Sequence, residues 1–278
     1  MTWIEVYLDF VVFLFGAVIG SFLNVCIHRM PLDQSIVTPP SHCPHCNTRI
    51  RWIDNIPLFS FLVLRGKCRQ CGVKISPRYF LVELLTATLF LLMWLKLTQW
   101  EHPPVHGIHF LKGPIFWLVI AGLIVATFID FEHYIIPNEI TLGGIVAGLV
   151  LSAAYPPLMG ADSMTSSLLR SFLGVLVGGL TLLAVAFIGE LIFRKEAMGM
   201  GDVKFLAAIG AFLGWQSTLF TIFVSSLFGG VIGLVLVLVN KKGWQSRIPY
   251  GPYIAFGALL WMFCGQQIMN WYWSFIRG

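Results

Sequence analysis

The sequence predicts an all-α polytopic membrane protein with about eight transmembrane helices and one small folded insert between the first two helices. Three observations support this fold class. Of the 278 residues, 57% are hydrophobic and only 11% are charged, whereas a soluble domain carries about a quarter charged residues. Long apolar runs recur along the chain, and a single polar, cysteine-containing stretch separates the first run from the second.

Each predicted helix corresponds to one apolar run. A spanning helix needs roughly 20 apolar residues, because the hydrocarbon core is about 30 Å thick and each helical residue rises about 1.5 Å. Seven runs approach or reach that length: 6–27, 79–97, 114–129, 140–154, 168–193, 218–239 and 250–268. An eighth, 203–216, would be only about 21 Å long, so we expect a thinned bilayer or a water-filled recess beside it.

The first run is predicted to be an anchor with its N-terminus outside. A cleavable signal peptide opens with positive charge, whereas this run opens with Glu5 and Asp9. Gly16 and Gly20 have the small-xxx-small spacing that lets helices approach closely, and helix packing is their expected role.

Lysine and arginine placement predicts the orientation, since basic loops stay in the cytoplasm. With the insert inside, 14 of the 18 basic residues are cytoplasmic. Beyond the insert these are Arg194, Lys195, Lys204, Lys241, Lys242 and Arg247. Both termini then lie outside. This asymmetry accounts for the net charge of +5, so no nucleic-acid partner is expected.

The chain is predicted to have three parts: a first helix at 1–27, a cytoplasmic insert at 28–78 and a helical membrane domain at 79–278. The insert contains Cys43-Pro-His-Cys46 and Cys68-Arg-Gln-Cys71. Two such pairs supply four thiolates to one tetrahedral zinc ion, and metal binding stabilises a lobe too small to build a core. A disulfide reading conflicts with a cytoplasmic location. Cys26 and Cys264 are expected to be buried small hydrophobic residues.

Two aspartates at helix ends are the candidate catalytic residues. The third predicted helix runs inward and ends at Asp130, and the short sixth helix starts from the inside at Asp202. Two carboxylates at one depth can share a proton, and then the ionised member deprotonates a water while the protonated member polarises a carbonyl. Gly199 and Gly201 precede Asp202 and would let a substrate backbone approach it.

The same aspartates have an alternative interpretation without a catalytic role. In it, both are solvated interfacial residues paired with Lys204 or His133. The nearby Glu132, Glu139, Glu190 and Glu196 are expected to be ordinary interfacial carboxylates. Glu83 is more suspicious, because it lies just inside an apolar run and charges within a membrane are functional suspects. Asn138 is predicted to be the N-cap of the fourth helix.

The residues in this order resemble the bifunctional type IV prepilin peptidases, also called leader peptidase/N-methyltransferases. The resemblance covers nearly the whole chain. Its motifs are Gly20-Ser-Phe-Leu-Asn-Val25, the two Cys-x-x-Cys pairs with Trp52-Ile-Asp-Asn-Ile-Pro-Leu58 between them, Ile75-Ser-Pro-Arg-Tyr79, Leu81-Val-Glu-Leu-Leu-Thr86, Asp130 with Ile136-Pro-Asn138, and Gly199-Met-Gly-Asp-Val-Lys204.

The resemblance implies that Asp130 and Asp202 are the catalytic pair and that Gly199, Gly201 and Lys204 shape the site. It implies a bacterial inner-membrane enzyme that cleaves prepilins or pseudopilins on the cytoplasmic side. The new N-terminal residue would then be methylated with S-adenosylmethionine. No fingerprint for that cofactor is present in the sequence, and Glu83, Arg78 and Asn24 are candidates for its neighbourhood from resemblance and charge placement alone.

Three alternatives remain open at this point. A peptidase without methyltransferase activity would share every motif. An ion-coupled transporter would also place carboxylates at helix ends, although its repeated halves and midplane helix breaks are not evident here. A zinc-bearing membrane scaffold would not need the aspartates. The sequence does not indicate which pilin is processed or what the oligomeric state is.

Overall fold

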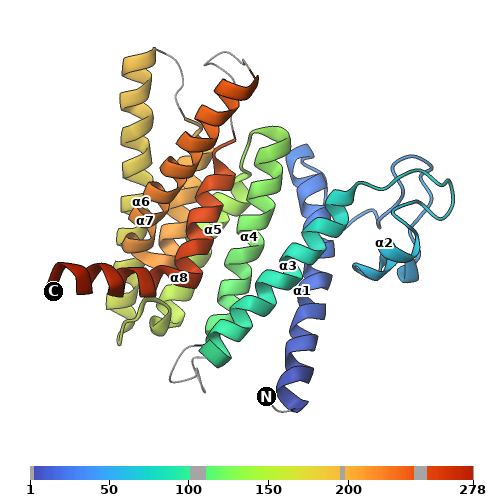
Figure 1. Cartoon of the computed structure of the whole chain (residues 1–278), viewed down its shortest axis with the longest axis horizontal. Helices are drawn as coiled ribbons and strands as arrows, with labels where there is room; N and C mark the ends of the chain where they lie inside the picture. The colour runs from blue at the N-terminus through green and yellow to red at the C-terminus, as the bar shows by residue number, and fades with distance from the viewer. Residues whose placement is uncertain (1–2, 101–110, 195–197, 241–248, 278) are drawn as a thin grey trace. The chain divides into compact units, whose positions relative to one another are not determined.

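The computed structural model describes residues 3–100, 111–194, 198–240 and 249–277. Some residues with predicted locations lie outside these ranges: the basic residues Lys195, Lys241, Lys242 and Arg247, which are predicted to be cytoplasmic, and Glu196. The chain divides into two compact units, Met1–Val125 and Ala126–Gly278, and each is described by itself. Both are helical, with the insert protruding as a loop-rich lobe from the first unit (Figure 1).

The first unit is built on the packing of α1 (Trp3–Arg29) against α3 (Pro77–Leu95). A Cβ atom on Gly16 would lie 2.7 Å from Ala87 Cα, and one on Gly20 would lie 2.7 Å from Glu83 Cα. The two glycines therefore let the backbones touch, and the predicted packing role is confirmed. Helix α3 begins after Ser76, whose side chain accepts a hydrogen bond from the backbone N–H of Arg78.

Aromatic side chains join the rest of this unit to these two helices. Helix α3 continues into a π-helical turn, η3 (Lys96–Trp100), and α4 (Lys112–His133) follows. Trp117 of α4 stacks on Phe90 at 5.3 Å, and its indole N–H donates to the Phe90 carbonyl at 3.0 Å. Asp9, within the apolar α1, accepts a hydrogen bond from the Trp94 indole at 3.0 Å. A polar group inside an apolar helix is thereby satisfied.

The insert between α1 and α3 has little regular structure. It contains η1 (Met30–Leu32), η2 (Trp52–Asn55) and the short helix α2 (Phe59–Val63). Its described residues form only isolated bridges, His42 with Arg49 and Lys67 with Lys74. Few large side chains are buried there, so the lobe depends on polar contacts and on its cysteines.

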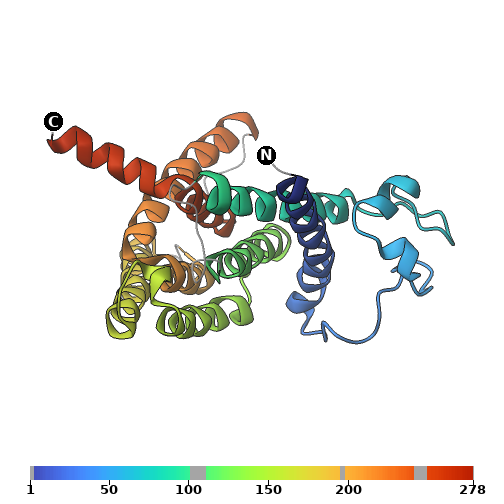
Figure 2. The ribbon, with the colours of Figure 1, turned by 90° about the horizontal axis from the view of Figure 1, so that it is seen from below.

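The second unit comprises the end of α4 with α5 (Asn138–Ala154), η5 (Pro156–Met159), α6 (Met164–Phe193), α7 (Met200–Asn240) and α8 (Gly251–Arg277). Helix α7 packs against α5, α6 and α8 (Figure 2). A Cβ on Gly178 of α6 would lie 2.7 Å from the Leu206 carbonyl oxygen, and one on Gly148 of α5 would lie 2.6 Å from Ala211 Cβ. Small residues of α5 and α6 thus pack closely against the first half of α7 and determine where its N-terminus lies.

Helix α7 is broken at Gly214, which has φ +80° and ψ 174°. The hydroxyls of Ser217 and Thr218 donate to the Gly214 carbonyl at 2.6 and 3.0 Å. Such side-chain donors satisfy the backbone groups that a break would otherwise leave unpaired in an apolar surrounding. The predicted runs 203–216 and 218–239 are therefore two arms of one broken helix, and the first arm is short, as expected.

Five of the described helices are long and apolar enough to cross a membrane: Trp3–Leu32, Pro77–Gln99, Lys112–His133, Met164–Ile192 and Met200–Leu236. Helix α5 is apolar but shorter. Helix α8 forms where predicted, with polar Gln266, Gln267 and Asn270 in its second half. The prediction that Cys264 is buried is wrong, because it lies on an exposed face of α8, whereas Cys26 is buried. A helix face turned to lipid needs no protein partner to shield an apolar side chain.

Candidate active site and metal centre

Asp130 lies near the C-terminal end of α4 and is 5% exposed. The chain reverses just after it: Tyr134 takes a left-handed conformation with φ +57°, and its N–H donates to the Asp130 carbonyl at 3.0 Å. The carboxylate Oδ2 accepts a hydrogen bond from the backbone N–H of Gly251 at 2.8 Å. The first residue of α8 therefore holds the side chain at the end of α4.

Asp202 lies in the first turn of α7 and is half-buried. Its N–H donates to the Gly199 carbonyl at 3.1 Å. A carboxylate is favourable there, since unpaired backbone N–H groups make a helix N-terminus positive. The two carboxylates are near enough for their charges to act on one another. The structure thus brings together the aspartates that the sequence places 72 positions apart.

Two glycines allow the surrounding backbone to close around this pair. A Cβ on Gly201 would lie 3.4 Å from the backbone N of Ile136. One on Gly251 would lie 2.9 Å from Asp130 Oδ2 and 3.1 Å from Ile136 Cδ1. The Tyr250 hydroxyl and Ser225 of α7 form a hydrogen bond at 2.8 Å, which fixes the start of α8. Ile136 is therefore packed between the first turns of α7 and α8.

Sequence reasoning missed Gly251. The available signal was a glycine between two prolines, in Pro249-Tyr-Gly-Pro252, immediately before an apolar run. Such a pattern marks a turn that leads into a helix. It does not reveal that the glycine N–H reaches a carboxylate 121 positions away.

The prediction that Asn138 caps α5 is wrong. The N-cap is Pro137, with φ −59° and ψ 145°, and no side chain caps the helix. Asn138 is the first helical residue, and its Oδ1 accepts a hydrogen bond from Lys204 Nζ at 3.1 Å. Lys204 therefore links the starts of α5 and α7 through this amide.

The four cysteines of the insert form a compact cluster. Their Sγ atoms all lie within 4.8 Å of one another, and those of Cys43 and Cys71 are 3.9 Å apart. A tetrahedral zinc ion with Zn–S bonds of about 2.3 Å requires S···S separations of about 3.8 Å. The four side chains thus fit a metal ion of this kind.

The two Cys-x-x-Cys knuckles repeat one backbone pattern. In the first, Cys43 N–H donates to the Thr48 carbonyl and Asn47 N–H donates to the Cys43 carbonyl, at 3.0 and 2.9 Å. In the second, Cys68 N–H donates to Val73 and Gly72 N–H donates to Cys68, at 2.8 and 2.9 Å. Asn47 and Gly72 both have positive φ, which asparagine and glycine tolerate better than other residues do.

The thiol environments favour a bound cation. Hydrogen bonds with Thr48 lower the pKa of Cys46 to about 6, and the backbone amides of Cys71 and Gln70 lower the pKa of Cys68. Although the Val73 amide acts in the same direction on Cys71, desolvation and the neighbouring thiols raise its pKa to about 11. Four thiolates cannot coexist this closely without a positive ion, and a coordinated metal removes that obstacle.

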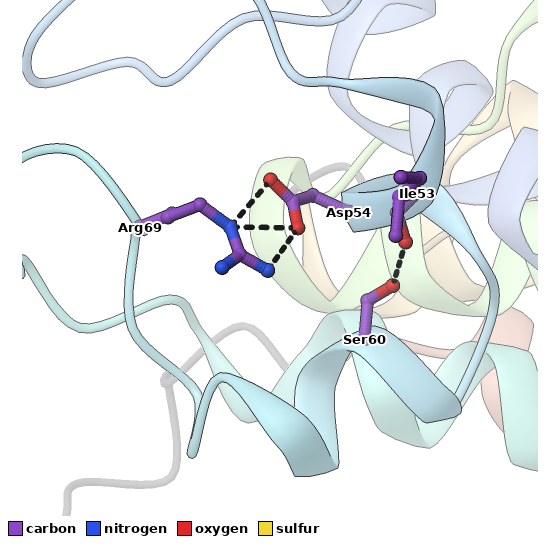
Figure 3. Close-up of polar contacts among 4 residues, drawn as sticks. All are labelled: Ile53, Asp54, Ser60 and Arg69. Atoms are coloured by element: carbon purple, nitrogen blue, oxygen red, sulfur yellow. Dashed lines mark hydrogen bonds and ion pairs between the residues drawn. The ribbon is translucent and has the colours of Figure 1, made fainter.

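An ion pair braces the second knuckle (Figure 3). Arg69, between its two cysteines, donates from Nη2 to Asp54 Oδ1 at 2.7 Å and from Nε to both carboxylate oxygens at 3.0 Å. These hydrogen bonds lower the pKa of Asp54. The Ser60 hydroxyl donates to the Ile53 carbonyl at 2.8 Å. Together these contacts tie η2 to α2 and to the metal centre.

A cavity of about 990 Å³ lies within the first unit, between the insert and the cytoplasmic-side ends predicted for α1 and α3. Asn24, Arg78 and Glu83 all line it. The structure thus collects in one place the three residues that the sequence offers as candidates for cofactor binding. Glu83 and Asn24 are buried, at 8% and 1% exposed.

Comparison with known proteins covers both units. Residues 14–97 match the model of the bacterial peptidase A24 N-terminal domain, and residues 117–234 match that of the type IV leader peptidase family. A relative in Aeromonas hydrophila, named prepilin leader peptidase/N-methyltransferase, is 37% identical over 94% of this chain and 92% of its own length. The chain belongs to the type IV leader peptidase family.

Other members of this family carry the same printed name. The Pseudomonas aeruginosa relative is 33% identical over 94% of this chain and 92% of its own length. The Myxococcus xanthus relative is 41% identical over 84% of this chain, and the match spans 65% of that protein's length. No solved structure matches the chain. The first matched region contains the cysteines and Glu83, the second contains both aspartates, and Gly251 lies outside both.

Proposed function

We propose that this protein cleaves the leader peptides of prepilins or pseudopilins and then methylates the new N-terminal nitrogen. The observation that carries the cleavage activity is the placement of two carboxylates, Asp130 and Asp202, at the ends of α4 and α7, where Gly251 and Gly201 both pack against Ile136. Membership of the type IV leader peptidase family, and relatives whose name includes N-methyltransferase, support the assignment of both activities.

Peptide hydrolysis at this pair needs one proton between two carboxyl groups. Like charges held close cannot both ionise readily, so one aspartate is a carboxylate and the other a carboxylic acid. The carboxylate takes a proton from a water, whose oxygen forms a bond to the scissile carbonyl carbon, while the acid donates its proton to the carbonyl oxygen. The tetrahedral intermediate then collapses: the C–N bond breaks, the newly protonated aspartate gives its proton to the leaving amine, and the other aspartate takes back the hydroxyl proton as the carbonyl forms again. The Gly251 N–H occupies one oxygen of Asp130 and leaves the other for that water.

Methyl transfer is assigned to the cavity of the first unit. Its volume of about 990 Å³ is at the upper end of the range for small-molecule sites, about 300–1,000 Å³. A buried carboxylate, a buried amide and a guanidinium in its wall are polar groups that can orient the two reactants of a methyl transfer. The cavity that Glu83, Asn24 and Arg78 line would hold S-adenosylmethionine, which supplies an electrophilic methyl group when bound.

The metal centre is assigned a structural role. Cys43, Cys46, Cys68 and Cys71 would hold Zn²⁺ with four protein ligands, and a closed coordination sphere leaves no position for water or substrate. The ion would therefore stabilise the insert, which forms part of the cavity wall, and would not act as a Lewis acid.

The membrane arrangement follows from the same proposal. The chain is placed in the bacterial inner membrane, with the insert and aspartates facing the cytoplasm and both termini outside, as the basic residues indicate. The substrate is an apolar helix with a polar leader. Such a chain diffuses laterally in the lipid and presents its leader at the cytoplasmic boundary, which a soluble protease does not easily reach.

Cleavage of a prepilin in proteoliposomes by wild type, Asp130→Asn and Asp202→Asn tests the proposal. Both variants keep the shape of the side chain and remove the ionisable group. We expect both to lose cleavage and to keep methylating a pre-cleaved substrate. Normal cleavage by either variant would eliminate the dyad. If the wild type cleaves but never transfers a methyl group, the protein is a peptidase without methyltransferase activity.

A further inference from the structure

Glu83 lies in the cavity wall, and its hydrogen bonds to the protein do not explain why a charged side chain is buried there. The side chain projects from α3 at the residue whose Cα packs against Gly20 of α1. The backbone N–H of Leu58 donates to Oε2 at 2.8 Å, and Ser21 also hydrogen-bonds the carboxyl group. Both donors are neutral, and a carboxylate buried among neutral groups is costly unless a ligand supplies positive charge.

The contact with Leu58 involves local strain. Leu58 has φ +62° and ψ −51°, a conformation that a branched residue rarely adopts. Strained backbone of this kind occurs preferentially at functional sites. A neutral glutamine side chain would accept the same N–H, so the hydrogen bond to Leu58 does not require the negative charge of Glu83.

Asn24 adds a second acceptor to the same wall. Its Nδ2 donates to the carbonyls of Tyr79 and Gly20 at 3.0 and 3.3 Å. Because both partners are carbonyl oxygens, the amide orientation is determined and Oδ1 points elsewhere. Within the described part of the chain that buried oxygen has no hydrogen-bond partner. A buried acceptor without a donor indicates that a ligand donor belongs there.

The rest of the cavity has the opposite character. Asp54, the other carboxylate that lines it, is already held by Arg69. Many of its remaining charged side chains are basic: Arg29, Arg49, Arg51, Lys74 and Arg78. A methyl donor with its own carboxylate suits the basic wall. A cationic group made of N–H donors suits Glu83 and Asn24.

A smaller cavity of about 490 Å³ continues from this wall along α1. It shares Ser21 and Val25 with the larger cavity and adds Val18 and Phe22. Val18 and Phe22 are exposed on the apolar surface of α1. An acceptor wall is therefore followed by an apolar surface. A ligand with an ammonium group at the end of an apolar chain matches this arrangement.

We propose that Glu83 and Asn24 bind the methyl acceptor, the α-ammonium group at the new N-terminus of the cleaved chain, while its apolar first residue lies along Val18 and Phe22. The proposal rests on the N-methyltransferase activity assigned above. In this proposal Glu83 and Asn24 bind the methyl acceptor, and the other residues of the cavity bind the methyl donor.

Glu83 would also receive the proton that the reaction requires. The ammonium group transfers one proton to the carboxylate and becomes a free amine. Its nitrogen lone pair then forms the C–N bond as the C–S bond of the sulfonium donor breaks, and the C–S electron pair stays on sulfur. The product is a methylated ammonium, and Glu83 returns its proton to water.

The test measures three properties of full-length wild type and Glu83→Gln in proteoliposomes: prepilin cleavage, binding of S-adenosylmethionine by calorimetry, and methylation of a pre-cleaved substrate. We expect methylation to fall on the order of 100-fold, as for loss of a buried charged partner. Cleavage and donor binding should stay within about twofold. Asp33→Asn is the matched control, because Asp33 is exposed, does not line the cavity and has a left-handed conformation that asparagine tolerates.

A second measurement does not depend on the variant folding. Wild type should bind a cleaved-substrate peptide with a free N-terminal amine more tightly than the same peptide N-acetylated, by at least tenfold. Equal binding of the two peptides would overturn the proposal. So would full methylation by Glu83→Gln, or loss of donor binding in that variant. A wild type that transfers no methyl group would instead reject the methyltransferase assignment itself.

Discussion

The two units hold their buried charges by different means. In the second unit, Asp130 and Asp202 lie at helix ends that glycines bring together, and a backbone N–H from α8 fixes one of them. In the first unit, Glu83 projects from a helix into a cavity whose other wall is a loop-rich insert. The first arrangement depends on helix packing alone. The second depends on an insert that is held by an ion pair and, as we propose, by a bound metal ion.

The difference indicates that the two proposed activities should fail separately. Helix packing through small residues is continuous with the membrane fold, so damage there affects cleavage. The insert has no helix or core of its own large enough for independent stability, so damage there affects the cavity. The four substitutions below separate the two dependences, from the largest expected effect to the smallest.

Cys43→Ser should abolish methylation and leave cleavage much less affected. Metal binding by a four-cysteine site contributes on the order of 10 kcal/mol to the folding of a small lobe, and Cys43 is the buried member of the cluster. Zinc content by elemental analysis and both activity assays on one preparation measure the effect. Equal loss of cleavage and methylation would show that the insert also supports the second unit.

Gly251→Ala should lower cleavage by roughly 10- to 100-fold, as expected when a hydrogen bond to a charged group is lost. The new methyl group would lie 2.9 Å from Asp130 Oδ2 and would displace the carboxylate. We expect kcat to fall more than KM rises, and methylation to be unchanged. Gly230→Ala is the control, since a Cβ there meets no atom within 4 Å. Wild-type kcat in Gly251→Ala would show that this contact does not position Asp130.

Gly20→Ala should destabilise the first unit by about 1–3 kcal/mol, as overpacking does. Its Cβ would lie 2.7 Å from the Cα of Glu83 and 3.1 Å from the Thr86 hydroxyl, so α1 and α3 must separate. Thermal unfolding in detergent and the methylation rate report the change. Gly143→Ala, in open space on α5, should be neutral. If Gly20→Ala impaired cleavage more than methylation, the two units would not be independent.

Asp54→Asn should have the smallest effect, a modest rise in the rate of zinc release to a chelator. Because Arg69 lowers the pKa of Asp54 in the folded protein, the contribution of this ion pair is present above the unfolded carboxyl pKa of about 3.9. It is lost only as pH falls through the lower, folded value. The difference from wild type should therefore be equal at pH 5.5 and pH 8, and 1 M salt should reduce it. A difference that grows toward pH 8 would contradict this account.

Local patterns were sufficient for the helices and the cysteine cluster. Apolar run length predicts the spanning helices, because the thickness of the bilayer sets a minimum length that can be read directly from the sequence. The Cys-x-x-Cys pairs predict the cluster, because each knuckle is a local turn and only four thiolates are needed. The two aspartates are also visible in the sequence, since charged residues at the ends of apolar runs stand out from their surroundings.

The sequence by itself determined the fold class, the family resemblance and the residues worth suspecting, because these depend on composition and on spacing within single segments. Only the tertiary structure decided that Gly251 donates to Asp130, that Asn138 contacts Lys204 instead of capping α5, and that Glu83 and Asn24 share one cavity wall. Each of these contacts joins segments dozens of residues apart. Their geometry follows from helix packing distances, which glycine placement permits but no local pattern specifies.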